Sequence, residues 1–175
     1  MKNHFALLVI DVQKGLFMRP VPVYQADDLI KNLNLLIKRA REKHVPVFFI
    51  QHSNKFLSKG GDSWRIHPAL ERRASDRIIP KQTASAFQRT ALERELRAGG
   101  LTTVVITGLV THGCVRATCL NALKLGLKAI LVKDGHSSYN KRAARLIEEW
   151  NQKLSGVGAE LKAVEEIDFK GKYHE

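Results

Sequence analysis

The sequence has few cysteines and no long apolar run, and each absence excludes a class of protein. Its 175 residues include only two cysteines, Cys114 and Cys119, too few for a disulfide-rich secreted domain. They stand five positions apart, a spacing at which a helix would point them in different directions, so we do not expect a disulfide. No apolar run approaches the roughly 18 residues that a membrane helix needs, and the N-terminal segment lacks a signal-peptide pattern. We therefore expect a cytoplasmic protein that does not bind membranes.

The charge is strongly unbalanced. Lys and Arg number 29 against 17 Asp and Glu, which gives a formal net charge of +12, and such an excess raises the question of nucleic-acid binding. The basic residues are scattered among Ala, Leu and Glu at helical spacing, which is typical of solvated helix faces. Zinc-finger spacing and RNA-binding aromatic motifs are absent from the sequence. We expect no nucleic-acid partner, with an anion-attracting field as the alternative.

Predicted strands and helices alternate along the chain. The continuous apolar run 5–10 suits a central strand that is buried on both faces. Apolar residues in 27–43 recur at helical spacing. Further strands are predicted over 45–50, 77–80, 102–107, 127–132 and 159–164, and further helices over 88–98, 115–125 and 141–154. This order predicts an α/β fold in which helices cover both faces of a parallel sheet. An apolar content of 44% is enough for one core, so we expect residues 1–175 to form a single domain.

Polar residues and a glycine follow the predicted strands directly. They are Asp11, Gln51, His52, Gly108 and Asp134. Ligands of parallel α/β sheets bind beyond the carboxyl ends of the strands. We therefore expect these residues to gather at one edge of the sheet.

Cys114 is the first candidate for chemistry. It lies in the segment GLVTHGCV, residues 108–115, between a predicted strand and a predicted helix. Backbone N–H groups and the dipole at a helix N-terminus favour a thiolate, and the same N–H groups can hold an oxyanion. The alternative is that Cys114 is a small buried apolar residue. Its position alone leaves both interpretations open.

The same segment resembles the G-x-x-T-x-x-C-V motif of the isochorismatase-like cysteine hydrolases, which include nicotinamidases, N-carbamoylsarcosine amidase and streptothricin hydrolase. Four more segments resemble family motifs in the same order along nearly the whole chain: LVIDVQ at 8–13, WRIHP at 64–68, IPK at 79–81 before SAF at 85–87, and LVKDGHSS at 131–138. The resemblance implies a three-layer α-β-α, Rossmann-like fold with a mainly parallel sheet of roughly six strands.

The resemblance also implies a catalytic triad of Asp11, Lys81 and Cys114. A nucleophilic thiol needs a base, and a neighbouring carboxylate can take its proton. An ammonium group beside them stabilises both the carboxylate and a thiolate. We therefore expect a hydrolase that cleaves a small amide, carbamoyl or lactam substrate through a Cys thioester. Without the resemblance, Asp11 is as well explained as a cap and Lys81 as a surface residue.

The loop before the nucleophile has a further implied feature. The family places a non-proline cis peptide there, which falls at Leu109–Val110 in this sequence. The N–H groups of Val110 and Cys114 would then form the oxyanion hole, with Thr111 bracing the loop.

A metal site is not expected. Nicotinamidase-type relatives hold a metal with an Asp-x-His pair and another His, but the second predicted strand here ends IQHS and has no Asp. His52 and His67 remain, fewer than the three protein ligands usual for zinc. We predict no metal and no cofactor, which argues against nicotinamide as substrate. Isochorismatases proper cleave a vinyl ether without a cysteine, so Cys114 favours amide chemistry. A nicotinamidase- or isochorismatase-type hydrolase and a non-catalytic binding protein stay open as alternatives.

Aromatic and polar residues near the predicted strand ends are candidates for the substrate pocket. Phe17 and Trp64 are favoured because similar positions face substrate in the family, and ordinary packing is the alternative for all of them. The candidates are Phe17, Gln51, His52, Trp64, Phe87, His112 and Tyr139. The resemblance also implies a homodimer or homotetramer.

Overall fold

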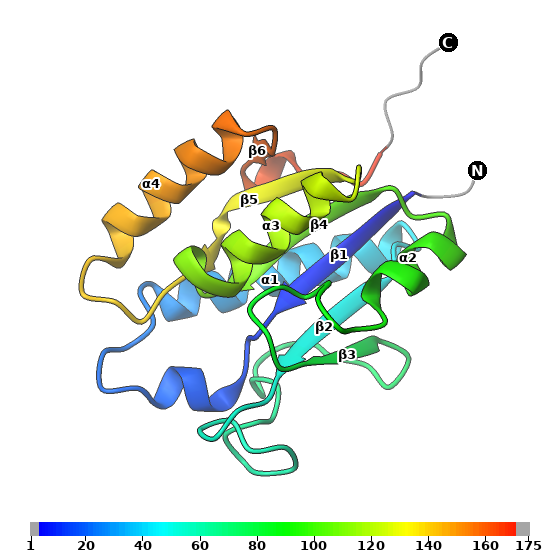
Figure 1. Ribbon diagram of the computed structural model, residues 1–175. Helices are drawn as coiled ribbons and strands as arrows, with labels where there is room; N and C mark the ends of the chain where they lie inside the picture. The colour runs from blue at the N-terminus through cyan, green and yellow to red at the C-terminus, as the bar shows by residue number, and fades with distance from the viewer. Residues whose placement is uncertain (1–3, 171–175) are drawn as a thin grey trace.

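A six-stranded parallel sheet forms the middle layer of the molecule (Figure 1). The computed structural model describes residues 4–170. The strand order is β3-β2-β1-β4-β5-β6. The strands are β1 (Phe5–Ile10), β2 (Val47–His52), β3 (Arg77–Lys81), β4 (Thr103–Leu109), β5 (Lys128–Ser137) and β6 (Glu160–Lys162). The predicted parallel α/β sheet is therefore confirmed.

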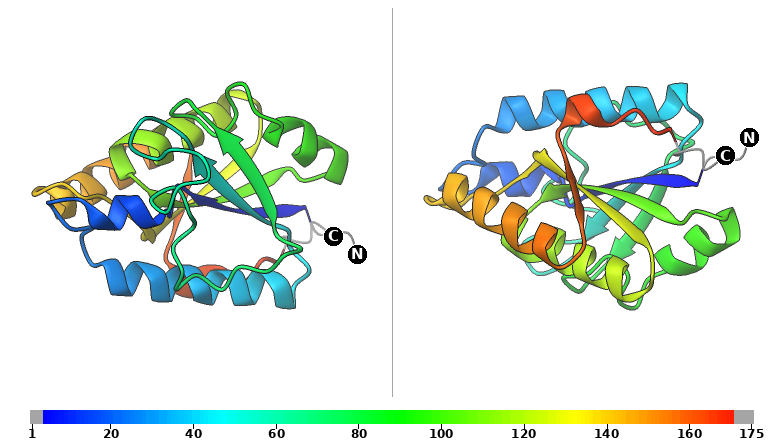
Figure 2. Two further views of the ribbon diagram at one scale, coloured as in Figure 1. Left: turned by 90° about the horizontal axis from the view of Figure 1, so that it is seen from below. Right: turned by 90° about the horizontal axis from the view of Figure 1, so that it is seen from above.

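Helices cover both faces of the sheet, which gives three layers (Figure 2). One face carries α1 (Ala26–Glu42) and the short helix η3 (Val164–Glu166). The other face carries α2 (Leu92–Gly99), α3 (Arg116–Lys124) and α4 (Ala143–Gly156). Among residues 4–170, no helix is both long enough and apolar enough to cross a bilayer.

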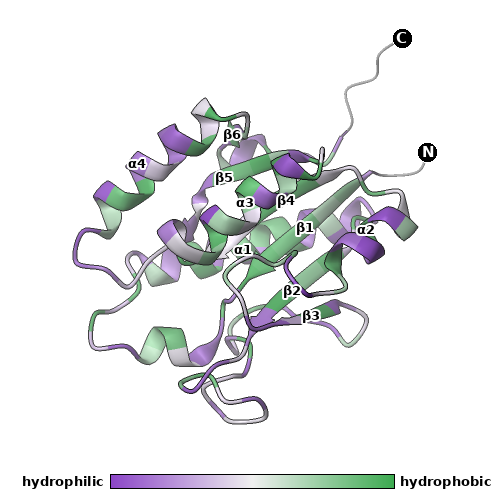
Figure 3. Cartoon of the chain, viewed as in Figure 1, coloured by the Kyte–Doolittle hydropathy of each residue, from purple (hydrophilic) through white to green (hydrophobic). Residues whose placement is uncertain are grey.

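The strands supply two separate apolar cores because successive side chains of a strand point to opposite faces. Leu7 and Val9 of β1 pack toward α1, whereas Ala6, Leu8 and Ile10 pack toward α2 and α3. Figure 3 shows the apolar strands between helices of mixed hydropathy. Fully burying a Leu or Ile side chain contributes about 1.5–3 kcal/mol. Burial on both faces of β1 therefore fixes the strand that carries the first site residue.

The prediction that the residues after the strands gather at one edge of the sheet is confirmed only in part. Strand β5 continues to Ser137, five residues beyond its predicted end, so Asp134 lies inside the strand. Its carboxylate accepts a hydrogen bond from Val164 N at 2.9 Å. Asp134 therefore ties β5 to the η3 segment, and the prediction that it directly follows the end of a strand is wrong.

The long connection between β2 and β3 is anchored rather than free. Gln13 and Ile66 form an isolated antiparallel bridge, and His67 N donates to Val12 O at 2.8 Å. Between these partners lies an unpredicted 3₁₀ helix, η1 (Lys14–Met18). The residues just after β1 and the distant loop thus share one backbone network beside the site.

Candidate active site

Asp11 follows β1 and has an unusual backbone conformation. Its φ is +52°, in the left-handed region that Asp tolerates better than most residues. The neighbouring Gly108 of β4 has φ +114°, and a Cβ there would lie 2.1 Å from Ile10 O. Only glycine therefore lets β4 approach β1 at this point. This approach brings the loop that leads to Cys114 next to Asp11.

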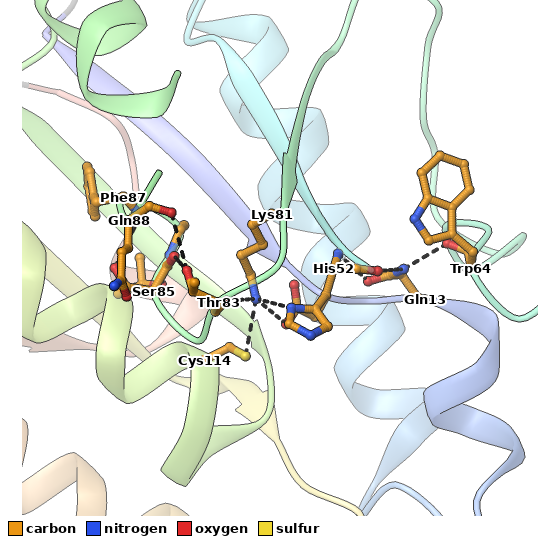
Figure 4. Close-up of polar contacts among 12 residues, drawn as sticks. Gln13, His52, Trp64, Lys81, Thr83, Ser85, Phe87, Gln88 and Cys114 are labelled. Atoms are coloured by element: carbon orange, nitrogen blue, oxygen red, sulfur yellow. Dashed lines mark hydrogen bonds and ion pairs between the residues drawn. The ribbon is translucent and has the colours of Figure 1, made fainter. Parts of the chain in front are cut away.

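Lys81 ends β3 and joins the site residues together (Figure 4). Its Nζ lies 2.9 Å from Asp11 Oδ2, 2.9 Å from His52 Nδ1 and 3.3 Å from Cys114 Sγ. A fourth contact, at 3.0 Å, is with the carbonyl oxygen of Thr83. The Lys81 side chain is 0% exposed. An ammonium has three hydrogens for these four acceptors, so the proton positions in the cluster depend on one another.

Cys114 lies in the irregular turn η2 (Thr111–Val115), which leads directly into α3. Burial and, to a smaller extent, the Asp11 charge raise the pKa of its thiol to about 12, while the Lys81 charge opposes them. The expectation that the helix N-terminus favours a thiolate is therefore wrong for the free protein. Desolvation of the charged form is the largest cause of the raised pKa. The resting Cys114 side chain is therefore a thiol, and it would need a base in order to act as a nucleophile.

Asp11 is placed to be that base. Burial raises the pKa of its carboxyl, whereas the nearby Lys81 ammonium and Cys114 thiol lower it. Oδ2 contacts Lys81, and Oδ1 is buried without a conventional hydrogen-bond partner among residues 4–170. One carboxylate oxygen of Asp11, one ring nitrogen of His52 and Sγ of Cys114 all lie within 4.8 Å of one another. A buried carboxylate oxygen with free lone pairs beside a thiol can accept its proton.

His52 and Gln13 support the cluster. Burial and the Lys81 charge lower the pKa of His52, so its neutral ring accepts from Lys81 through Nδ1. Gln13 is fully buried; its Oε1 accepts from His52 N at 2.8 Å, and its Nε2 donates to His52 O and Trp64 O. Gln13 is absent from the residues chosen from the sequence as site candidates. The sequence does place Gln13 three residues after the buried strand β1, and this position could have marked it as a site candidate.

A neutral hydrogen-bond chain supports the loop on the other side of Cys114. Asn151 Nδ2 donates to Lys133 O, so its Oδ1 accepts from His136 Nε2 at 2.8 Å. His136 Nδ1 then accepts from Thr111 Oγ1 at 2.8 Å. Burial lowers the pKa of His136 to about 4, which keeps the ring neutral. The bracing role expected of Thr111 agrees with these contacts, and the cis peptide expected at Leu109–Val110 is present.

The predicted pocket residues lie in different surroundings. His52 contacts the cluster, whereas Gln51 and Trp64 line a cleft of about 490 Å³ between the sheet and the loop that follows β2. Phe87 is only 9% exposed and packs in the core with α2 and α3; its ring points away from Lys81 in Figure 4. The Phe87 ring therefore packs in the core, and its contact with substrate stays a prediction.

The other three candidates are partly buried. The Phe17 ring contacts the His67 ring, with 4.4 Å between centroids, and His112 has a buried Nδ1 without a partner in the described chain. Tyr139 follows the end of β5 and packs on the core next to α1. Contact of these residues with substrate stays a prediction.

Metal binding has a physical obstacle at this cluster. Asp11, His52 and Cys114 offer three donor types, but the Lys81 ammonium already contacts all three. A cation entering there would displace the group that balances the buried Asp11 charge. His67 is not among the clustered donors. The absence of a metal stays a prediction, and the geometry suits proton transfer better than ligation.

These features define the class: a three-layer α/β protein in which a buried carboxylate and a buried ammonium lie beside a half-buried thiol at the carboxyl edge of the sheet. The model of the isochorismatase domain family matches residues 5–152, and the chain belongs to this family. The resemblance stated from the motifs is thereby confirmed.

Individual relatives agree with this assignment. Streptothricin hydrolase from Streptomyces noursei is 29% identical over 79% of this chain and 51% of the relative, so the chain spans about half the length of that protein. Maleamate amidohydrolase from Pseudomonas putida is 28% identical over 74% of this chain and 70% of the relative. The crystal structure of an isochorismatase family protein superposes with a TM-score of 0.88 at 28% identity, over 93% of this chain and 100% of that one.

Proposed function

We propose that the protein is a cysteine amidohydrolase that cleaves a small amide, carbamoyl or lactam substrate. The observation that carries the proposal is the Lys81 ammonium in contact with both Asp11 and Cys114 in a buried site. The named hydrolase and amidohydrolase relatives support it. A binding protein would have little use for a buried charge pair beside a thiol, because such pairs are costly to desolvate.

The proposed reaction begins at the neutral thiol. Asp11 takes the Cys114 proton as Sγ attacks the carbonyl carbon, and Lys81 stabilises the negative charge that the sulfur and carboxylate share. The backbone N–H groups of Val110 and Cys114 hold the tetrahedral oxyanion. Asp11 then gives its proton to the departing nitrogen, which leaves a thioester on Cys114. Asp11 activates a water that hydrolyses the thioester and frees the thiol.

The test is ammonia release from a panel of small primary amides, with mass spectrometry of the protein during turnover. We expect a mass increase that equals the acyl group and maps to Cys114, and no such species in Cys114→Ser. Ammonia release that persists in Cys114→Ser would overturn the proposed nucleophile. Lactams release no ammonia, so their ring opening is followed by mass spectrometry of the product; failure to hydrolyse every amide, carbamoyl compound and lactam tested would favour a binding protein on this fold.

A further inference from the structure

The register of two strands brings His52 to Lys81. Strands β2 and β3 are parallel neighbours, and His52 is the register partner of Lys81. Successive side chains of a strand point to opposite faces, and Ile50 and Ile79, each two residues earlier, pack on the face of α2 and α3. The side chains of His52 and Lys81 therefore meet on that face. A slip of one residue would turn His52 to the opposite face, so the register itself selects this contact.

A buried amide fixes the backbone of His52 from the other side. Strand β1 ends at Ile10, and beyond it the side chain of Gln13 continues the pairing with β2. Its Oε1 accepts a hydrogen bond from His52 N at 2.8 Å, and its Nε2 donates to His52 O at 2.9 Å (Figure 4). Gln13 is buried. The backbone that carries the His52 ring is thus held on both sides, by β3 and by Gln13.

The Lys81 ammonium has one acceptor more than it has hydrogens. Three acceptors lie at 2.9–3.0 Å from Nζ: Asp11 Oδ2, His52 Nδ1 and the carbonyl oxygen of Thr83. The fourth, Cys114 Sγ, lies at 3.3 Å. A thiol sulfur is a weak acceptor, so the three nearer atoms take the three hydrogens while Cys114 is protonated. A thiolate would compete for one of them.

The contact between His52 and Lys81 depends on the proton of the His52 ring. Nδ1 accepts only in a neutral ring that carries its proton on Nε2. Burial and the Lys81 charge lower the pKa of His52, whereas the Asp11 charge and the Thr83 carbonyl raise it. Cys114 is the other titratable group of the cluster, and its thiol is uncharged at rest. The surroundings of the ring therefore favour its neutral form.

We propose that His52 is a positioning residue for Lys81. His52 Nδ1 and the Thr83 carbonyl keep two hydrogens of the ammonium, and the third turns from Asp11 to Cys114 when the Cys114 proton passes to Asp11. The nitrogen of Lys81 then stays in place while the negative charge moves from carboxylate to sulfur, which is electrostatic preorganisation. This inference rests on the proposed function, since it assigns a role in the same reaction. The alternative is that His52 only fills space beside Lys81.

Two substitutions of His52 separate positioning from packing. His52→Asn keeps an uncharged acceptor, its Oδ1, near the place of Nδ1, whereas His52→Leu has a similar size and no acceptor. We expect His52→Leu to lower kcat for hydrolysis about 10- to 100-fold with little change in KM, because an ammonium that shifts toward Sγ no longer keeps Asp11 ionised as the base. His52→Asn should keep most of kcat.

His44→Asn is the matched control and should change neither constant. His44 is exposed beyond the end of α1, and its φ of +55° is one that Asn tolerates. An equal loss of kcat in His52→Asn and His52→Leu, or no loss in His52→Leu, would overturn the inference and assign His52 to packing. A loss confined to KM would also overturn it, because His52 would then bind substrate.

Two further measurements need no substrate. Nitrogen NMR of the histidine-labelled protein, with the His52 signals assigned by their loss in His52→Asn, should show the proton on Nε2 at pH 8; a proton on Nδ1 would overturn the inference. Alkylation of Cys114 by iodoacetamide at pH 8 should be faster in His52→Leu than in the wild type, because the released hydrogen stabilises the thiolate, and unchanged in His52→Asn. If no substrate is hydrolysed, the proposed function fails, and these two results still decide whether His52 positions Lys81: equal alkylation of His52→Leu and the wild type would overturn it.

Discussion

The two sides of the candidate site use buried polar groups of opposite kinds. On the side of β1 and β3, Asp11 and Lys81 form an ion pair with exposed fractions of 4% and 0%. On the side of β4 and β5, Thr111, His136 and Asn151 form a neutral chain. The charged side lies where the proposed reaction moves a proton, and the neutral side holds the backbone before Cys114 in place. Burying charge is costly, so a fold that needs only support is better served by neutral hydrogen bonds.

The largest effect should come from breaking the charged side. Asp11→Asn should lower ammonia release by about 10⁴-fold and destabilise the protein by about 3–5 kcal/mol, because it leaves the Lys81 ammonium buried without its partner. Cys114→Ser should lose as much activity and little stability, since it replaces one neutral group by another. Urea unfolding and an ammonia assay measure both quantities.

Asp62→Asn is the control for this comparison, because it removes an exposed carboxylate that pairs with Lys14. Exposed pairs contribute little, so no measurable change in stability is expected. Equal stability of Asp11→Asn and Cys114→Ser would contradict the view that the ion pair is a charged, buried unit.

The pH dependence of stability tests the neutral side. The pKa of His136 falls from 6.5 to about 4 on folding, so between these values the unfolded chain binds more protons than the folded one. Stability should therefore fall as pH drops from 6.5 to 4, by about 3 kcal/mol from this group alone. The difference between wild type and His136→Gln isolates the effect from Asp11, whose raised pKa acts in the opposite direction. Urea unfolding at several pH values measures it, and parallel curves would contradict the buried neutral ring.

A smaller effect should follow from shortening the neutral chain. Thr111→Val removes the donor to His136 Nδ1 and should cost about 1–3 kcal/mol of stability. It should also lower activity roughly tenfold, because the loop before Cys114 loses support. Thr107→Val is the matched control: its hydroxyl is equally buried and donates to Leu8 O at 2.8 Å within the sheet. Thr107→Val should lose stability and keep its activity. If both variants lose the same activity, Thr111 contributes only to the stability of the fold and does not support the loop for catalysis.

The smallest effect concerns the thiol itself. Because the pKa of Cys114 is about 12, its rate of alkylation by iodoacetamide should keep rising with pH between 7 and 9. Asp11→Asn removes a negative charge that raises this pKa, so alkylation at pH 8 should become faster. Cys119, buried on α3 with a pKa also raised to about 12, is an internal control whose rate should not change. Peptide mass spectrometry follows both cysteines, and a plateau for Cys114 below pH 8 would contradict the protonated thiol.

Local patterns predicted a large part of the fold and some of the site. The apolar run of β1 and the strand-loop-helix pattern around Cys114 place two site residues at one edge of a parallel sheet. Lys81 entered only through the family resemblance, because a lone lysine after a short strand is ordinarily a surface residue. Gln13 and the pair of His136 and Asn151 were not selected as site residues, since their partners lie far away in the sequence.

The sequence by itself determined which residue types are available and the order of the elements that carry them, because hydrophobic periodicity is a local property of the chain. Only the tertiary structure decided how those residues behave. Asp11 and Lys81 are 70 positions apart and become an ion pair only when β1 and β3 stand in one sheet. The protonation of Cys114 follows the same rule: a helix N-terminus alone favours a thiolate, but burial by several distant elements raises the pKa to about 12. Desolvation depends on everything packed around a group, and no local pattern contains that information.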